Sequence, residues 1–227
     1  MCGIVGIVDT SGRDVSILRS AVKRMNDALA HRGPDDWGIV TLHAGSVTHH
    51  SMACPQGEHL ASTQPRLDRA TVLLGHRRLA IIDLSAGGHQ PMRTADGRFW
   101  LTLNGEIYNY RELRDELKAD GVAFNSTSDT KVVLALFARE GIQCLQKLRG
   151  MFAFAVWDER ERALFMARDR FGIKPLYYGQ TGDGLFLFAS ELKVILCSGF
   201  FSKDIDKDSE IVFLQSGSIR APNTFYR

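Results

Sequence analysis

The second residue of the chain is a cysteine, and its position gives it chemistry that an internal cysteine lacks. Removal of Met1 would leave Cys2 with a thiol and a free α-amino group on one residue, followed by Gly3. An α-amine has a pKa of about 7.7 to 8.0, so its neutral form can accept the thiol proton directly or through one water. Cys2 is therefore a candidate N-terminal nucleophile that needs no separate histidine base. A cysteine at this position also arises by chance, so the assignment depends on the rest of the chain.

A thiolate that attacks a carbonyl makes a tetrahedral oxyanion, which requires hydrogen-bond donors held in place beforehand. Asn104 and Gly105 come directly after a predicted strand at residues 99–103. The Asn side-chain amide and the Gly backbone N–H could point at one site, and glycine permits a close approach. The alternative is a plain Asn-Gly turn.

An amino-acid substrate also needs a cation for its carboxylate and an anion for its ammonium group. Arg78 could form a bidentate pair with the carboxylate, and Asp129 or Glu106 could receive the ammonium. Taken singly, each of these residues is more often a surface charge than a ligand.

The remaining cysteines do not indicate a metal site or a disulfide framework. Cys54, Cys144 and Cys197 form no C-x-x-C pair with one another or with Cys2, and their spacing to the seven histidines does not suggest zinc. Cys144 and Cys197 lie in apolar stretches, so both are expected to be small buried hydrophobic residues.

Length and composition favour a globular protein of one large domain, or two at most. The 227 residues are 44% hydrophobic and 24% charged, with a formal net charge of +2. The longest apolar runs, of seven residues each, are far too short to span a membrane. Interleaved charges do not fit a nucleic-acid binder, and no secretory signal is evident, so a cytoplasmic chain is expected. This composition demands no cofactor.

The pattern of elements predicts an α+β layered domain. Helices are expected from a cap at Asp14 through Leu29, at residues 110–120 and at residues 129–140. Strands are expected at residues 2–8, 38–43, 71–75, 78–83, 99–103, 152–158, 163–169, 175–179 and 185–189. Short polar turns favour antiparallel pairing over a parallel βαβ sheet. Residues 44–69 show no period and are interpreted as an exposed loop or insertion.

Six ordered motifs together resemble the class II glutamine amidotransferase family, and most closely the N-terminal glutaminase domains of glutamine-hydrolysing asparagine synthetases. They are Met1-Cys-Gly-Ile-Val-Gly6, His31-Arg-Gly-Pro-Asp35, Gly75-His-Arg-Arg-Leu-Ala-Ile-Ile-Asp83, Leu103-Asn-Gly-Glu-Ile-Tyr-Asn109, Ser128-Asp129 and Arg168-Asp-Arg-Phe-Gly-Ile-Lys-Pro-Leu-Tyr177. The resemblance implies the four-layer αββα fold of N-terminal nucleophile (Ntn) hydrolases. It assigns residues 1–198 to the glutaminase domain and residues 199–227 to an extension leading toward a synthetase domain.

The resemblance also implies a role for each candidate residue. Cys2 matches the nucleophile, and Asn104 with Gly105 matches the oxyanion hole. Glu106 and Asp129 match the positions that hold the amino end of glutamine. The stretch that binds glutamine is matched by Arg78, on the α-carboxylate, and by an apolar wall of Leu79, Ala80, Ile81 and Ile82.

Two further motifs receive more general expectations. Residues 31–35 resemble a loop near the nucleophile, without a definite role. Residues 168–177 are interpreted as a structural, packed hairpin, because their apolar residues alternate. Residues 44–69 form a longer segment than the simplest family members have, which bears on the rim of the site.

The implied activity is hydrolysis of L-glutamine to L-glutamate and ammonia through a thioester on Cys2. In the complete enzyme, the ammonia would serve ATP-dependent amidation of aspartate by a synthetase domain, in cis or in trans. ATP and Mg²⁺ are expected only there, since these 227 residues contain no Ser-Gly-Gly-x-Asp-Ser phosphate loop. We therefore interpret the chain as part of a longer reading frame. A homodimer is possible, and the sequence does not decide the oligomeric state. Alternatives are a non-catalytic or regulatory domain, or a glutaminase that serves another acceptor such as a sugar.

Overall fold

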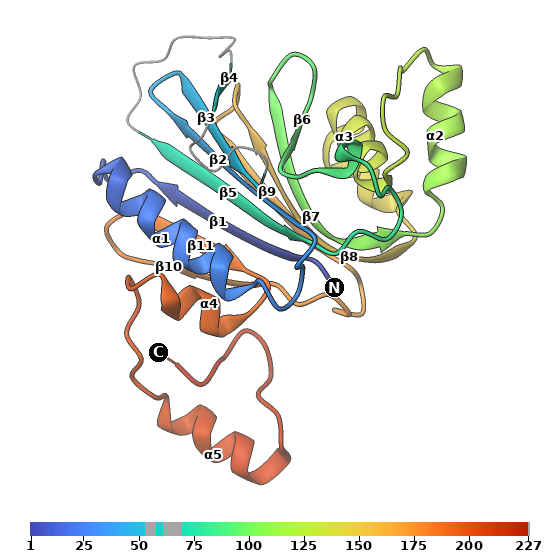
Figure 1. Ribbon diagram of the computed structural model, residues 1–227. Coiled ribbons are helices and arrows are strands. Elements are labelled where there is room, and N and C mark those ends of the chain that lie inside the picture. Colours follow the sequence, from blue (N-terminus) through green and yellow to red (C-terminus); the bar gives the residue numbers. More distant parts are fainter. Residues whose placement is uncertain (53–57, 61–69, 227) are drawn as a thin grey trace.

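Two antiparallel sheets face each other in the computed structural model, which describes residues 1–52, 58–60 and 70–226 (Figure 1). The larger sheet has the order β10-β11-β1-β5-β2-β3-β4. Its strands are β1 (Gly3–Asp9), β2 (Asp36–His43), β3 (Ser46–Ser51), β4 (Glu58–Leu60), β5 (Thr71–Arg78), β10 (Tyr177–Gln180) and β11 (Leu185–Ala189). The smaller sheet has the order β6-β7-β8-β9 and consists of β6 (Met92–Arg93), β7 (Phe99–Ile107), β8 (Gly150–Asp158) and β9 (Ala163–Arg168).

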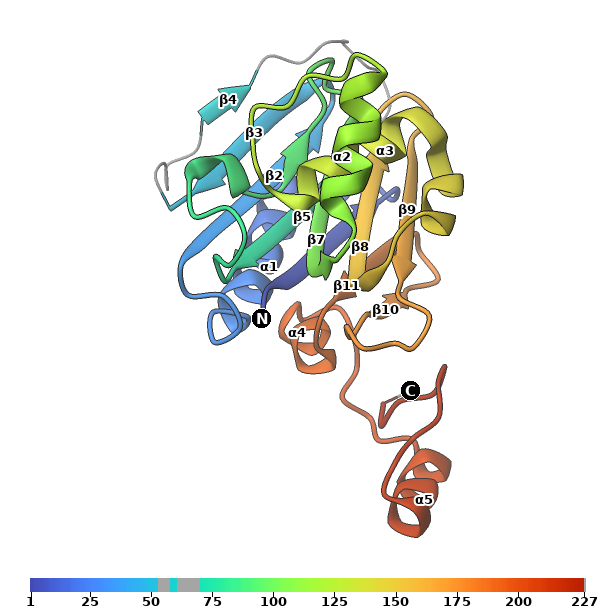
Figure 2. The ribbon, with the colours of Figure 1, turned by 90° about the vertical axis from the view of Figure 1, so that its right-hand side faces the viewer.

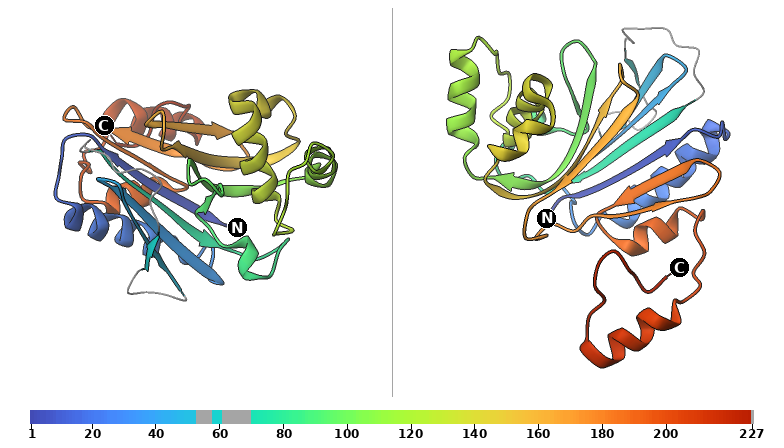
Figure 3. Two further views of the ribbon diagram at one scale, coloured as in Figure 1. Left: turned by 90° about the horizontal axis from the view of Figure 1, so that it is seen from above. Right: turned by 180° about the vertical axis from the view of Figure 1, so that it is seen from behind.

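Helices cover the outer faces of both sheets, as Figure 3 shows from above and from behind. Helices α1 (Val15–Ala28) and α4 (Leu192–Cys197) pack on the larger sheet, and α2 (Tyr110–Ala119) and α3 (Asp129–Glu140) lie on the side of the smaller one. Short 3₁₀ turns follow at η1 (Ala86–Gly88) and η2 (Gly141–Gln146). The predicted four layers, α-β-β-α, are confirmed.

The helix ends follow from their sequence. Asp14 caps α1, because its carboxylate accepts from the backbone N–H of Ser16, and Ser128 caps α3 by accepting from Thr130 N. Gly141 ends α3 with a positive φ of 59°, a conformation that costs other residues more than glycine. The three predicted helices are therefore confirmed to within two residues at each end.

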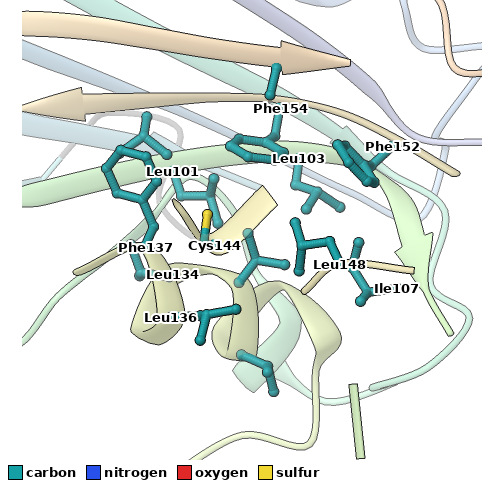
Figure 4. Packing of buried hydrophobic residues seen from close by; sticks show 14 of the residues in the cluster. Leu101, Leu103, Ile107, Leu134, Leu136, Phe137, Cys144, Leu148, Phe152 and Phe154 are labelled. Atoms are coloured by element: carbon teal, nitrogen blue, oxygen red, sulfur yellow. The ribbon is translucent and has the colours of Figure 1, made fainter. Parts of the chain in front are cut away.

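The apolar residues divide among three layers of core. In β1, Ile4 faces the opposite sheet while Val5 and Ile7 face α1, so this central strand is buried on both sides. Trp100 and Trp157 fill the space between the sheets. A third cluster lies between the smaller sheet and α3, and Figure 4 shows its packing around Leu103, Phe152 and the neighbouring side chains. Cys144 belongs to this third cluster and is fully buried, as predicted.

Two expectations about the larger sheet are wrong. Residues 46–51 are not a loop but strand β3, which pairs with β2 from Gly38↔Ser51 to His43↔Ser46. The rest of that predicted insertion, including Cys54, mostly lies outside the described residues. The two strands predicted at residues 71–75 and 78–83 are a single strand, β5, because β1 pairs with it as far as Arg77 and β2 as far as Arg78. Residues 79–83 leave the sheet.

Residues 168–177 are not a hairpin but the connection from β9 in one sheet to β10 in the other. The Asp169 carboxylate organises this connection by accepting from four backbone N–H groups, those of Phe152, Phe171, Ile173 and Lys174. Four such bonds outweigh the effect of burial and hold the pKa of Asp169 below its usual range. Phe171 and Ile173 are exposed in this connection, so their alternation does not mark a packed hairpin.

The C-terminal region contains two helices that the sequence pattern did not predict, α4 and α5 (Lys207–Ser216). Helix α5 projects from the body of the molecule, and the chain then returns to form a bridge between Ile205 and Tyr226 (Figure 2). Cys197 is exposed at the last position of α4, so the expectation that it is buried is wrong. A six-residue helix buries one face only, and Cys197 lies off the face that Val194 and Ile195 bury.

Candidate active site

A cavity lies where β1, β5, β7 and the start of α3 meet. Motifs that are more than 70 residues apart in the sequence converge there. Its lining residues are Met1, Cys2, Arg78, Leu79, Ile81, Ile82, Asp83, Gly88, Gln90, Leu103, Asn104, Gly105, Glu106, Ser128, Asp129, Thr130 and Lys174. Every candidate site residue named from the sequence is in this set except Ala80.

Cys2 is half-buried, immediately before the first residue of β1. Its Sγ lies 3.4 Å from the backbone nitrogen of Leu79, which donates to it, and 3.5 Å from the carbonyl oxygen of Leu79. Burial raises the pKa of the thiol, while the Leu79 N–H, the N-terminal charge and the Arg78 charge oppose that rise. Because the pKa stays above its ordinary value, the thiol needs a base nearby in order to react.

The loop at residues 31–35, expected near the nucleophile, contacts it directly. Arg32 donates from Nε to the carbonyl oxygen of Cys2 over 2.9 Å and from a second nitrogen to Glu191 over 3.0 Å. His31 also bonds to Glu191. Burial raises the pKa of Glu191, but hydrogen bonds from Lys193, His31 and Arg32 outweigh it and bring the pKa to about 2. The ionised Glu191 therefore anchors the arginine that holds the backbone of Cys2.

Asn104 and Gly105 lie inside β7, not in a turn after it, and pair with Ala153 and Phe152 of β8. Asn104 is 1% exposed, and neither its Nδ2 nor its Oδ1 has a hydrogen-bond partner within the described parts of the chain. Unpaired buried amides are rare, because each costs free energy. A Cβ on Gly105 would lie 2.4 Å from the carbonyl oxygen of Met151, so only glycine fits there.

The acidic end of the cavity is formed by Glu106 and Asp129. Asp129 is 5% exposed, and its carboxylate accepts from the backbone nitrogens of Ile107 (3.0 Å) and Thr130 (2.8 Å). Burial raises the pKa of Asp129 and the charge of Glu106 adds to the rise, against those two hydrogen bonds. A cationic group bound here would relieve the repulsion between the two carboxylates.

Arg78, the last residue of β5, also lines the cavity and donates to the carbonyl oxygen of Ser85 over 2.9 Å. The guanidinium fits only because residue 88 is glycine, since a Cβ there would lie 2.0 Å from Arg78 Nη2. Asp83 fixes the loop between them by accepting from Ser85 and Ser126, and these bonds hold its pKa well below the usual range.

The predicted apolar wall divides between two sides of this loop. Leu79, Ile81 and Ile82 line the cavity. Ala80 instead lines a neighbouring hollow, and its backbone nitrogen donates to the carboxylate of Asp35 over 2.8 Å. The chain bends at Ile81 and Ile82, so both of these residues reach the cavity and no simple alternation in the sequence sets Ala80 apart.

Gln90 and Lys174 are among the polar lining residues to which the sequence analysis gave no role in the site. Gln90 precedes β6 and is 5% exposed. Lys174 was placed in a segment interpreted as purely structural, yet its Nζ lies 3.5 Å from Met1 Sδ inside the site. Neither residue stands in a pattern with a defined chemical spacing, so only the folded arrangement identifies them.

Within residues 1–52, 58–60 and 70–226, no three or more His, Cys, Asp and Glu side chains are grouped so as to hold a metal ion. None of the helices described is both long and apolar enough to cross a bilayer.

Comparison with known proteins agrees with this geometry. The family model of the glutamine amidotransferase domain matches residues 1–69 and 64–227. Asparagine synthetase [glutamine-hydrolyzing] 1 of Bacillus subtilis is 39% identical over 92% of this chain and 28% of its own length. A putative asparagine synthetase [glutamine-hydrolyzing] of Methanocaldococcus jannaschii is 33% identical over 100% of this chain and 41% of its own. The chain thus spans well under half the length of these two relatives.

Solved structures support the same conclusion. The glutamine phosphoribosylpyrophosphate amidotransferase of B. subtilis superposes with a TM-score of 0.64 at 25% identity, over 87% of this chain and 44% of that one. This likeness confirms the predicted N-terminal nucleophile hydrolase fold. The chain belongs to the class II glutamine amidotransferase domain family and is homologous to the N-terminal glutaminase domains of asparagine synthetases.

Proposed function

We propose that this domain hydrolyses L-glutamine to L-glutamate and ammonia with Cys2 as the nucleophile, once Met1 has been removed. The single observation that carries the proposal is the cavity that is lined by both Cys2 and Asn104, whose buried amide has no partner within the described residues. A buried amide with no partner is what a site for a transient oxyanion requires.

The reaction divides into two halves. In the first, the free α-amine of Cys2 accepts the thiol proton, and the thiolate attacks the side-chain amide carbon of glutamine. The protonated amine then gives its proton to the leaving nitrogen, so that ammonia departs and a γ-glutamyl thioester remains. In the second half, the amine takes a proton from water, the hydroxide attacks the thioester, and collapse returns the thiol and releases glutamate.

The charges around the cavity fit the two ends of an amino acid. Arg78 would hold the α-carboxylate, and Glu106 with Asp129 would hold the ammonium. Asn104 Nδ2 and the backbone N–H of Gly105 would stabilise the oxyanion. Leu79, Ile81 and Ile82 would form the apolar wall beside the methylene groups. Ala80 is not part of this proposal, because it lies outside the cavity.

The ammonia acceptor is proposed from the relatives. The two sequence relatives described above, at 39% and 33% identity, are asparagine synthetases, whereas the phosphoribosylpyrophosphate amidotransferase is 25% identical. We therefore favour ATP-dependent amidation of aspartate, carried out with ATP and Mg²⁺ by a synthetase domain outside these residues. A cytoplasmic location belongs to the same proposal, because a free thiol nucleophile persists in a reducing compartment.

Intact-mass spectrometry tests the proposal directly. The purified protein would be measured before and after treatment with diazo-oxo-norleucine, an electrophilic glutamine analogue, alongside an assay of glutamate release. Loss of one Met and a single adduct on Cys2, with glutamine-dependent glutamate release, is the expected result. Retention of Met1 with no adduct would overturn the proposal in favour of a non-catalytic domain, because Met1 lines the cavity and an acylated Cys2 nitrogen is no base.

A further inference from the structure

Strand β7, which carries Asn104, has a full neighbour on one edge and a very short one on the other. β8 pairs with all nine residues of β7, from Phe99 to Ile107. On the opposite edge, β6 has two residues, which pair Met92 with Leu101 and Arg93 with Trp100. Continuing this antiparallel register places Gln90 opposite Leu103, immediately before Asn104.

At that position, a side chain replaces the missing strand. Gln90 Oε1 accepts from the backbone nitrogen of Leu103 over 2.7 Å, and Gln90 Nε2 donates to the carbonyl oxygen of Leu103 over 3.3 Å. A primary amide has the same donor and acceptor as a peptide group, so Gln90 reproduces both bonds of an antiparallel pair. Gln90 Nε2 also donates to Thr130 Oγ1 over 3.3 Å, which links Gln90 to the start of α3. The two hydrogen bonds between Gln90 and Leu103 are called the clamp below.

A second side chain meets the same carbonyl from the larger sheet. His76 Nε2 donates to the carbonyl oxygen of Leu103 over 3.0 Å. Burial lowers the pKa of His76 to about 3, so the ring is neutral near pH 7 and Nε2 carries its proton. The backbone of Leu103 is thus held by two buried side chains besides its own strand neighbour.

This clamp bears on Asn104 through the covalent chain. The Leu103 carbonyl belongs to the peptide plane that leads into Asn104, so its hydrogen bonds fix the orientation of that plane. The Asn104 side chain itself has no partner within the described residues, and its direction is therefore set by its backbone and by packing. Catalytic groups need to be held within about 0.5 Å of their productive geometry.

We propose that Gln90 is the positioning residue of the oxyanion hole, and that it acts by aligning the Leu103–Asn104 peptide from the unpaired edge of β7. This rests on the proposed glutaminase function. Gln90 stabilises the transition state through Asn104, because the hydrogen-bonding groups of its amide are already used by Leu103 and Thr130. Loss of the clamp should therefore lower turnover and leave the binding of ground-state glutamine nearly unchanged.

The test uses Gln90→Met, which keeps the side-chain length and removes both bonds to Leu103. We expect kcat to fall at least tenfold with KM for glutamine within about twofold of wild type. Affinity for glutamate γ-semialdehyde, whose adduct with Cys2 has an oxyanion-like oxygen, should fall by a similar factor. If Gln90→Met does not fold, Gln90→Glu is used instead, because it retains an acceptor for the Leu103 N–H but offers no N–H in return. The same fall in kcat with little change in KM is expected.

The matched control lies at the other end of β7, where Thr94 Oγ1 accepts from the backbone nitrogen of Phe99 over 3.1 Å. Thr94→Ala removes a comparable side-chain bond to the same strand, and it should lower the melting temperature without changing kcat. If the Gln90 variant matched Thr94→Ala in kcat, or lost kcat only together with KM and folding, the inference would be overturned. A wild-type protein that released no glutamate from glutamine would instead overturn the proposed function, and this inference with it.

Discussion

Arg32 Nε and the carbonyl oxygen of Cys2 lie 2.9 Å apart, joining a side chain from the turn after α1 to the backbone of the candidate nucleophile. The same guanidinium reaches Glu191, which precedes α4 near the other end of the domain. Two charged residues from distant parts of the sequence therefore position the first residues of β1. Because the pair is partly buried, its geometry and charge both bear on stability.

The first prediction concerns the pH dependence of this pair. Glu191 has a folded pKa of about 2 against an ordinary value of 4.5, so its ionised form stabilises the fold above pH 4.5. That contribution should be lost as the pH falls from 4.5 toward 2. We expect Glu191→Gln to lower the free energy of unfolding at pH 7, and the difference from wild type to shrink steadily below pH 4.5.

Urea unfolding at a series of pH values from 7 to 2.5 measures this difference. Glu161→Gln is the control, since Glu161 is 64% exposed and its loss should have little effect at any pH. A difference between Glu191→Gln and wild type that did not vary with pH would show that Glu191 acts through packing and not through its charge.

The second prediction concerns the nucleophile. Cys2→Ala should abolish glutamate release and leave glutamine bound, because it retains Arg78, Glu106 and Asp129, the residues proposed to hold the two ends of glutamine. Isothermal titration with glutamine and a coupled glutamate assay give the two readouts. Cys197→Ala removes an exposed thiol far along the chain and should leave both unchanged. Full activity in Cys2→Ala would refute the nucleophile assignment.

The third prediction concerns the oxyanion donor. Asn104→Ala should lower kcat by about a hundredfold or more, as expected when one preorganised donor is lost. The protein should lose little stability, since the amide of Asn104 has no partner to lose within the described structure. Steady-state kinetics and thermal melting report the two effects, with Asn125→Ala, at an exposed position, as the control. A large fall in melting temperature with unchanged kcat would make Asn104 a structural residue.

The fourth prediction concerns the space behind Arg78. A methyl group at position 88 would meet Arg78 Nη2 at 2.0 Å, and the guanidinium is the flexible end of its side chain. Gly88→Ala should therefore displace Arg78 and raise KM for glutamine roughly tenfold or more, with a smaller change in kcat. Gly182→Ala, where a new methyl group meets nothing within 4 Å, is the control. An unchanged KM would remove Arg78 from substrate recognition.

The sequence predicted the layers well, because its signals were local. Caps at Asp14 and Ser128 and the glycine at Gly141 define helices within a few residues of chain. Strand limits depend on partners far along the chain, and there the expectations were less accurate. β5 continues to Arg78 because β1 and β2 pair with it on both sides, and no signal in residues 71–83 records those partners.

The candidate site shows the same contrast between local motifs, which the sequence reveals, and contacts between distant segments, which it does not. Recognisable motifs located Cys2, Asn104 and Asp129, and the structure brings all three into one cavity. Gln90 and Arg32 could not be assigned from spacing, because each acts on a backbone group of another segment, Leu103 for one and Cys2 for the other. Any residue type offers a backbone carbonyl, so such contacts leave no trace in the sequence.

The central place of β1 has a consequence for the order of events during synthesis. β1 lies between β5 and β11, which begin at Thr71 and Leu185. At about 5 to 20 residues per second, the second of these partners leaves the ribosome roughly ten seconds or more after Met1. Until then, the strand cannot be enclosed on both edges. The fold therefore leaves an interval in which an aminopeptidase can remove Met1 before β5 and β11 fix the strand that follows Cys2.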